Sequence, residues 1–524
     1  MKNTGRTVVA VTALTLLCRA LSLLGYQAYM SFYDAETTSI GIFVYALKFP
    51  DVIFTSVGTA LTTVVVPMYS SMLAKNERAR ADMFLSNIIS VSGLLLIALV
   101  IAGAVAAPVF PAFSGYSGDA GSYAYAVFCL RTLMPVMFFF GLSFIFQGML
   151  QSNGRFFMPA CVSLPTSVLT VAYIFFFGDR FGVTGLLFVM LAGLSLQAVF
   201  LVPSVIATGY RYRPSFGFKD PELVAAAKMT PPVLAGVSAY QINMVFNVSM
   251  ATYFGATALL RLNNAQNLML AAALSFVYSI TAVYFPKLTA SWASGDADAY
   301  RSGLSEAIVT ALFFLLPLSA GFILLRYRIF DLLARWGSFG AEDVRLAGDF
   351  FGLYSLGMIA MGLKEILDRG FYAQKNTKIS AAVGFLIMGA NVAFSLILMR
   401  YAGAYALPVS FSASCTVGAA ALILIMRKKC GAFFAGATGD AIKCAASAAV
   451  MCAAVALASY LTNRAFSLPE ENVTIAARTA RLVVPAAVGA CVYFAAAYLL
   501  RVRCCRRMFA GIIKKRGAAD DTAR

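Results

Sequence analysis

The chain contains no histidine and few charged residues. Of its 524 residues, 12% are charged and 60% are hydrophobic, and the mean hydropathy is +0.80. These values exclude a string of soluble domains and indicate a membrane protein. Since no imidazole is present, Ser-His-Asp triads, His-containing zinc sites and histidine pH switches are excluded. We expect no enzymatic activity, no metal site and no cofactor.

Paired metal-binding or disulfide spacings are also missing. The ten cysteines are spread singly through apolar stretches, apart from the adjacent Cys504 and Cys505, and we expect buried, reduced thiols. The sequence has no G-x-x-x-x-G-K-[ST] phosphate loop and no polar stretch that could form an ATPase domain. Any transport must therefore be driven by gradients.

The net charge of +18 arises from 41 Lys and Arg against 23 Asp and Glu. The basic residues are scattered between long apolar runs, which excludes a nucleic-acid-binding protein and indicates a distribution set by membrane topology. Most of them fall on alternate loops of one face, so we predict that both termini are cytoplasmic. The segment 326–345 is an exception, because it places four Arg on the outer face. Contact with lipid headgroups is the one explanation that the sequence offers for it.

About fourteen apolar runs are long enough to cross a bilayer, which takes roughly 20 residues per helix. They predict an all-α, polytopic membrane protein. The predicted spans cover residues 7–30, 38–72, 83–107, 122–150, 157–178, 183–208, 230–254, 257–288, 303–325, 346–373, 378–399, 403–426, 438–461 and 479–500. The second, eighth and tenth runs are long enough to be bent or to project beyond the bilayer.

Weak internal similarity indicates a repeat. VVVPMYSS, with Pro67, aligns with AVYFPKLTAS, with Pro286, and Gly148-QSNGR aligns with Gly370 and AQKNT at a nearly constant offset. These colinear pairs predict two six-helix lobes that can rock around a central cavity. The lobes are residues 1–229, with a polar cytoplasmic linker at 210–228, and residues 230–430. Two further spans and a basic tail follow at 431–524.

A few ionisable residues lie inside predicted spans, where each costs about 2.5–3.5 kcal/mol and needs an explanation. Arg19, Lys48 and Arg261 would attract an anion if they face the cavity, and Arg suits a phosphate in particular. Two alternatives stay open. Lys48 could pair with Asp51 beside a kink at Pro50, and Arg261 could snorkel to the membrane surface.

Two other polar groups stand out. Lys364, Glu365, Asp368 and Arg369 form complementary pairs at helical spacing, which favours structural ion pairs. The seventh and eighth spans carry a set of amides that either bind sugar or peptide groups of a substrate or link helices. This amide set comprises Gln241, Asn243, Asn247, Asn263, Asn264, Gln266 and Asn267.

Several motifs, spread over essentially the whole chain, resemble the MurJ/MviN family. They are Arg19, ALKFPD with Lys48 and Pro50, Gly58, GMLQSNGRFFMP from Gly148, and GFYAQKNTK from Gly370. The resemblance implies the V-shaped fold of the multidrug/oligosaccharidyl-lipid/polysaccharide (MOP) exporter superfamily, with two helices added. It also implies a flippase that carries lipid II, the undecaprenyl-diphosphate precursor of peptidoglycan, to the outer leaflet of the bacterial inner membrane by alternating access. The implied partners are lipid II, membrane lipids and, for coupling, Na⁺ or H⁺ and the membrane potential.

The resemblance also implies site residues. Arg19 and Lys48 match cationic positions of the family, Asp51 and Asn267 stand where the family has Asn and Arg, and Arg261 lies six positions before that lost Arg. These five are the candidate substrate-binding residues. Four others are candidate gating or structural positions, namely Pro50, Gly58, Gly148 and Gly370. The departures leave open an exporter of another lipid-linked oligosaccharide or a MATE-like antiporter of cations or drugs.

Overall fold

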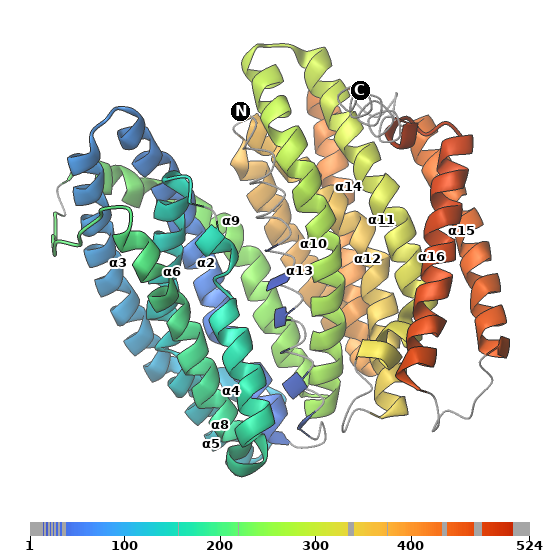
Figure 1. Cartoon of the computed structure of the whole chain (residues 1–524), viewed down its shortest axis with the longest axis horizontal. Helices are drawn as coiled ribbons and strands as arrows, with labels where there is room; N and C mark the ends of the chain where they lie inside the picture. Colours follow the sequence, from blue (N-terminus) through green and yellow to red (C-terminus); the bar gives the residue numbers. More distant parts are fainter. Residues whose placement is uncertain are drawn as a thin grey trace, which may run out of the picture. The chain divides into compact units, whose positions relative to one another are not determined.

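The computed structural model of the chain describes residues 38–155, 157–217, 220–333, 340–374, 376–431, 438–465 and 474–506, with scattered positions between residues 14 and 33. These residues form helices joined by turns and short loops (Figure 1). The long helices are α2 (Thr38–Ala74), α3 (Arg78–Ala106), α5 (Ala120–Leu133), α6 (Val136–Ser152), α8 (Leu164–Ile206), α9 (Pro221–Thr252), α10 (Ala256–Ala293), α11 (Ala297–Leu333), α12 (Ala341–Ala373), α13 (Thr377–Ala402), α14 (Ala406–Cys430), α15 (Thr438–Ala465) and α16 (Ile475–Leu499).

Helices cover the predicted membrane spans from residue 38 onward, and eleven of these thirteen spans correspond to described stretches with the length and apolarity of a membrane span; α2 and α9 are not among them. Within the described residues, nine stretches are long and apolar enough to cross a membrane. One of them, Phe157–Ile206, bends at Gly182, where φ is +57°, and another, Thr377–Cys430, is interrupted at Gly403, where φ is +55°. A positive φ favours glycine because it has no Cβ. Both breaks fall where the sequence predicts one span to end and the next to begin. The span predicted at 7–30 lies mostly outside the described residues.

The longest helices exceed the bilayer, as predicted. α2 has 37 residues and α10 has 38. At about 1.5 Å per residue, each extends roughly 55 Å, against about 30 Å for the hydrocarbon core. α2 continues as a helix through Pro50, so the proline does not end the span.

The chain divides into two compact units. One runs from Met1 to Leu260, and the other comprises Arg261–Arg335 and Gly340–Arg524. The first unit includes α9 because this helix packs along α2. The division therefore falls one helix later than the lobe boundary that the internal repeat places at 229/230. The predicted lobes and the V-shaped arrangement stay predictions.

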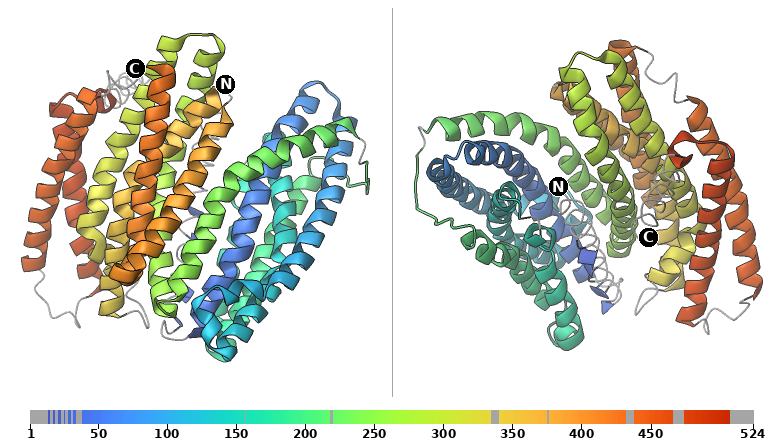
Figure 2. Two further views of the ribbon diagram at one scale, coloured as in Figure 1. Left: turned by 180° about the vertical axis from the view of Figure 1, so that it is seen from behind. Right: turned by 45° about the horizontal axis from the view of Figure 1, so that its top comes forward.

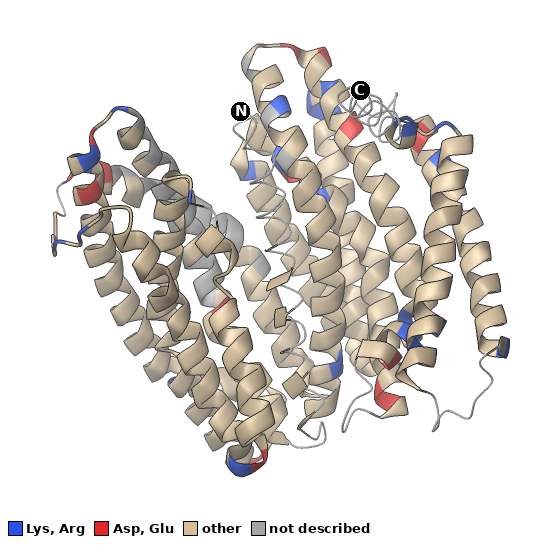
Figure 3. Cartoon of the chain, viewed as in Figure 1, with Lys and Arg blue, Asp and Glu red and all other residues tan. Residues whose placement is uncertain are grey.

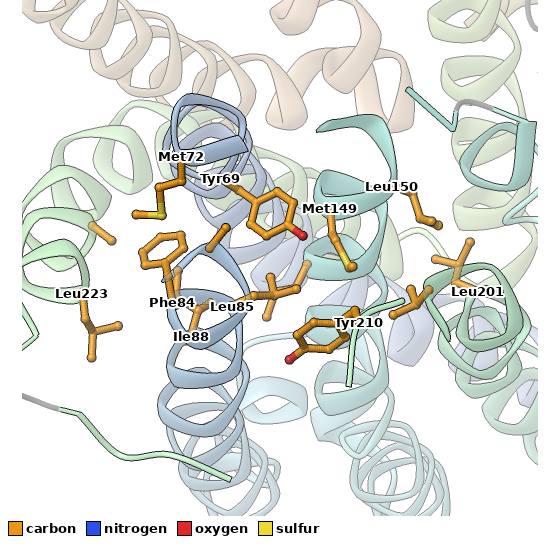
Figure 4. Packing of buried hydrophobic residues seen from close by; sticks show 14 residues of the cluster. Tyr69, Met72, Phe84, Leu85, Ile88, Met149, Leu150, Leu201, Tyr210 and Leu223 are labelled. Carbon is orange, nitrogen blue, oxygen red and sulfur yellow. The ribbon is translucent and has the colours of Figure 1, made fainter. Parts of the chain in front are cut away.

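The first unit is held by a core cluster that five helices share. Tyr69 of α2 and Phe84 of α3 lie close to Met149 of α6, while Leu201 of α8 and Leu223 of α9 complete the cluster (Figure 4). Each of these side chains is at most 9% exposed. A fully buried large apolar side chain contributes about 1.5–3 kcal/mol, so this cluster fixes the ends of five helices together.

The connection between α8 and α9 is bound to α3. Residues 211–217 are non-helical, and α9 begins at Pro221, so the second part of the predicted linker is helix. Two hydroxyl pairs attach the connection, Ser86 Oγ to Tyr210 OH at 2.9 Å and Ser90 Oγ to Tyr212 OH at 2.9 Å. The Asn87 amide donates to Asp220 at 2.9 Å. The linker is therefore seated on the first unit and not a free tether.

The last two helices pack on α11. Apolar residues of α11, α15 and α16 form one buried cluster, and the Tyr493 hydroxyl donates to the Phe313 carbonyl at 2.6 Å. α15 and α16 lie side by side in both views of Figure 2. All ten cysteines are free, as expected, and six are buried, including Cys505. The C-terminal pair is thus an integral part of the second unit.

Candidate functional site

Charged side chains are rare along the helices and gather at their ends (Figure 3). This distribution follows from the high cost of placing a charge in hydrocarbon. The few charges away from helix ends are therefore the natural starting point for locating a site, and each unit holds its own set.

In the first unit, Lys48 and Asp51 lie one turn apart on α2. Lys48 is partly buried, Asp51 is exposed, and Pro50 between them is buried. The Asp51 carboxylate is near enough to act electrostatically on the ammonium, yet these two described side chains form no ion pair. The expected alternative of local pairing beside Pro50 is therefore absent in this geometry. Arg19, the other candidate cation of this unit, lies outside the described residues.

Gly58 lies where α2 meets α6. A Cβ at this position would overlap the ring of Phe144, so only glycine permits this approach of the two helices. Gly148 is buried further along α6, where its carbonyl accepts from Ser152 Oγ at 2.9 Å. Both motif glycines thus have packing positions within the first unit.

In the second unit, Arg261 near the start of α10 is ion-paired. Its Nε donates to Asp343 Oδ1 at 2.7 Å, and its Nη2 contacts the same carboxylate. The other oxygen of Asp343 accepts from the Gly340 amide at 2.7 Å, which caps the start of α12. The Arg261 side chain is only 17% exposed. A role of Arg261 in substrate binding stays a prediction, and its charge is shared with a fixed carboxylate.

Six of the seven predicted amides are buried, and Asn267 is partly buried. Asn267 Nδ2 lies 3.4 Å from Asn263 Oδ1, one turn back on α10, and is partly buried. Gln241, Asn243 and Asn247 lie on α9 in the first unit and are at most 9% exposed. The Asn267 contact matches helix-internal hydrogen bonding, whereas its predicted role in substrate binding stays a prediction.

The charged group on α12 forms ion pairs, as the sequence favours. Lys364 Nζ lies 2.9 Å from Glu365 and 2.9 Å from Asp368. Arg369, the fourth member, stacks its guanidinium over Tyr372 at 5.7 Å. One turn beyond Glu365, the Gly370 carbonyl accepts from the buried Tyr300 hydroxyl at 2.9 Å, which ties α12 to α11. The charged group therefore has a structural role in the second unit, and we call Lys364, Glu365 and Asp368 the α12 joint.

The sequence did not predict a buried polar group on α13 and α14. Asn391 and Ser395 are 0% exposed and lie one turn apart on α13, and Ser410 of α14 is also 0% exposed. The side-chain atoms of all three lack a hydrogen-bond partner among the described residues. A Cβ at Gly418 would touch Ile387, which sets the antiparallel register and places Ser395 level with Ser410. The sequence did not indicate a site here, because a single serine or asparagine in an apolar run is typical of an ordinary contact between helices.

Comparison with known proteins identifies relatives. Residues 35–476 match the family model described as "Lipid II flippase MurJ". The probable lipid II flippase MurJ of Vibrio cholerae serotype O1 is 24% identical over 305 residues, which are 58% of this chain and 58% of the relative. The match thus spans less than two thirds of that relative's length.

Two solved structures share the fold. A lipid II flippase MurJ in an inward closed conformation matches with a TM-score of 0.75 at 19% identity, covering 94% of this chain and 98% of the other. An inward-facing MATE family multidrug resistance transporter of the MOP superfamily matches with a TM-score of 0.64 at 16% identity, covering 80% and 98%. At these identities the likeness shows the fold alone.

Proposed function

This chain belongs to the family of the lipid II flippase MurJ, and we propose from this premise that it translocates lipid II from the cytoplasmic to the outer leaflet. The observation that carries the proposal is the family match across residues 35–476, which runs from the start of α2 into α16. As a transporter of a finished precursor, the protein would make and break no covalent bond, in keeping with a chain that lacks histidine.

Lys48 and Arg19 are the groups that we propose for the diphosphate of the cargo. A guanidinium binds phosphate through two parallel N–H groups, and an ammonium acts as a compact point charge. Lys48 forms no ion pair with Asp51, so its charge is available to an anion. Arg261 shares its charge with Asp343 and would contribute less. Alternating access by the two lobes would then carry the bound headgroup across.

The membrane potential has the right sign to drive outward transport of the anionic cargo. A diphosphate with about two negative charges, moving outward across a membrane that is negative inside, gains roughly 4.6 kcal/mol per 100 mV when no counter-charge travels with it.

Oxygen donors such as those of Asn391, Ser395 and Ser410 suit a hard monovalent cation, and we propose this group as the place where Na⁺ would couple to transport. H⁺ coupling has no comparable donor set there.

We place the protein in the bacterial inner membrane with both termini in the cytoplasm. The positive-inside distribution of the loops supports this orientation. Its partners would be lipid II and the surrounding phospholipids, and its biological role would lie in peptidoglycan synthesis and cell shape.

The proposal is tested with purified protein in liposomes that contain fluorescent lipid II. We expect lipid II to reach the outside-facing leaflet, faster with a potential of the stated sign, and this chain to sustain growth of a strain depleted of its own flippase. Absence of lipid II transport combined with export of another undecaprenyl-linked saccharide would replace lipid II by that cargo. The departures at Asp51 and Asn267 are the reason to include this second substrate.

A further inference from the structure

A basic cavity lies within the second unit, where α11 and α15 end and α12 and α16 begin. Its volume is about 780 Å³, which is in the range of small-molecule pockets. Its charged lining residues are Arg328, Arg345, Arg478, Arg481, Asp331 and Glu342. Among the described residues that line the cavity, four guanidinium groups and two carboxylates give an excess of two positive charges. The proposed function assigns it no role.

Arg328 is the fixed centre of this cavity. Its guanidinium donates to the Ser459 carbonyl at 2.8 Å, the Arg481 carbonyl at 2.5 Å and Asn463 Oδ1 at 3.0 Å. These acceptors are neutral, so they hold the side chain in place without cancelling its charge. They also belong to α15 and α16, so Arg328 joins both helices of the C-terminal pair to α11.

The other arginines surround this centre at different depths. Arg478 Nε lies 3.9 Å from Asp331, while Arg345 at the start of α12 is exposed. Arg481 is partly buried on α16, one turn from Arg478. The clamped Arg328 guanidinium can hold a phosphate more firmly than a mobile side chain does, because less conformational freedom is lost on binding. The other arginines add positive charge around it.

The position of the cavity indicates where its ligand comes from. The ends of apolar helices lie at the level of lipid headgroups. The lining also includes Leu324 and Val344, so the cavity offers apolar surface beside its arginines. A lipid headgroup combines both chemistries, with a phosphate that continues into an apolar chain.

We propose that this cavity binds the phosphate of an anionic phospholipid headgroup and that the bound lipid fastens the C-terminal helix pair to the rest of the unit. With the predicted orientation, the lipid comes from the outer leaflet. This accounts for Arg328 and Arg345, two of the four arginines of segment 326–345 that the positive-inside rule does not explain.

The test uses the full-length protein in detergent, titrated with phosphatidylglycerol and followed by native mass spectrometry. The double variant Arg345→Gln/Arg481→Gln removes two cavity charges and leaves the Arg328 clamp in place, and we expect about a tenfold loss of affinity. The matched control is Arg131→Gln/Arg400→Gln, which changes two exposed arginines elsewhere and should bind as the parent does. Glu342→Gln should raise the affinity.

Three results would overturn the proposal. They are unchanged phosphatidylglycerol affinity in the cavity variant, an equal loss in the control, and binding of soluble glycerol 3-phosphate as strong as that of the lipid. The last of these would assign the cavity to free phosphate esters. If the double variant cannot be purified, Arg345→Gln alone at the exposed rim provides the same comparison.

Discussion

Lys48 of α2 and Lys364 of α12 are both partly buried, but their electrostatic surroundings differ. Lys364 of α12 is held between two carboxylates, each 2.9 Å away. Among the described residues, Lys48 of α2 has one carboxylate nearby, that of Asp51, and forms no ion pair with it. A buried charge whose partners surround it supports the fold, whereas one without an ion pair keeps its attraction for a ligand. The difference separates structural charges from candidate cargo-binding charges within one chain.

Removing the lysine of the α12 joint should have the largest effect. Lys364→Met removes the ion-pair partner of the buried Asp368 and of the partly buried Glu365, and we expect the free energy of unfolding to fall by about 3–5 kcal/mol. Thermal unfolding in mixed micelles measures this loss. The triple variant Lys364→Met/Glu365→Gln/Asp368→Asn should recover most of it. Equal stability of the single and triple variants would contradict the structural role.

For Lys48 of α2 we expect the opposite outcome, with transport lost and stability kept. Lys48→Ala should leave the unfolding temperature near that of the parent and slow lipid II transport roughly tenfold to hundredfold, because a hydrogen bond to a charged group contributes about 1.5–3 kcal/mol. Lys48→Arg should retain most transport. The assay is the liposome measurement described above.

Asp51→Asn is the matched neutralisation on the same turn of α2. Normal lipid II transport is expected for this variant. If Asp51→Asn abolished efflux of a cationic drug while Lys48→Ala had no effect on any transport, the site would be that of a cation antiporter and the comparison would be reversed.

We expect an intermediate effect for the ion pair between Arg261, near the start of α10, and Asp343, near the start of α12. Asp343→Asn weakens the contact with Arg261 and alters the cap of α12, and we expect a loss of about 2 kcal/mol in stability. A double-mutant cycle with Arg261→Gln measures the coupling, and the combined loss should be smaller than the sum. Additive losses would show that Arg261 owes its importance to something other than Asp343.

The smallest effect concerns the linker outside the membrane. Burial works to raise the pKa of Asp220, but hydrogen bonds from the Glu222 amide and the Asn87 side chain outweigh it and hold that pKa below its usual range. The stabilisation is therefore present above about pH 4, the ordinary value for Asp, and is lost as the pH falls through the lower folded-state pKa.

Hydrogen exchange of residues 211–217 measures this attachment, and exchange should accelerate at low pH. Asp220→Asn keeps a side chain that can cap α9 and removes the titration, so its exchange should lose the pH dependence of the parent. A parent protein whose linker exchanges at the same intrinsic-corrected rate at pH 3 and pH 7 would rule out the contribution of Asp220.

Local pattern predicted much of this molecule. Long apolar runs predicted the helices from residue 38 onward, because a segment in lipid must satisfy its own backbone hydrogen bonds and needs about 20 apolar residues to cross the bilayer. The Lys364 group was also predictable, since its partners are one and four residues away on the same helix. Both features depend on neighbours in sequence.

The tertiary structure decided which charges meet across helices. Arg261 finds Asp343 on another helix, Arg328 reaches acceptors on α15 and α16, and Ser395 comes level with Ser410 on α14. Spans that are apolar on every side carry no polar face that would set their rotation toward a neighbour. Close packing determines which side of each helix faces its neighbour, as at Gly58, where the absence of a side chain leaves room for the Phe144 ring. This packing depends on the whole bundle. The sequence by itself therefore determined a helical membrane protein and its few costly charges, and the packing of the helices decided which of those charges are paired.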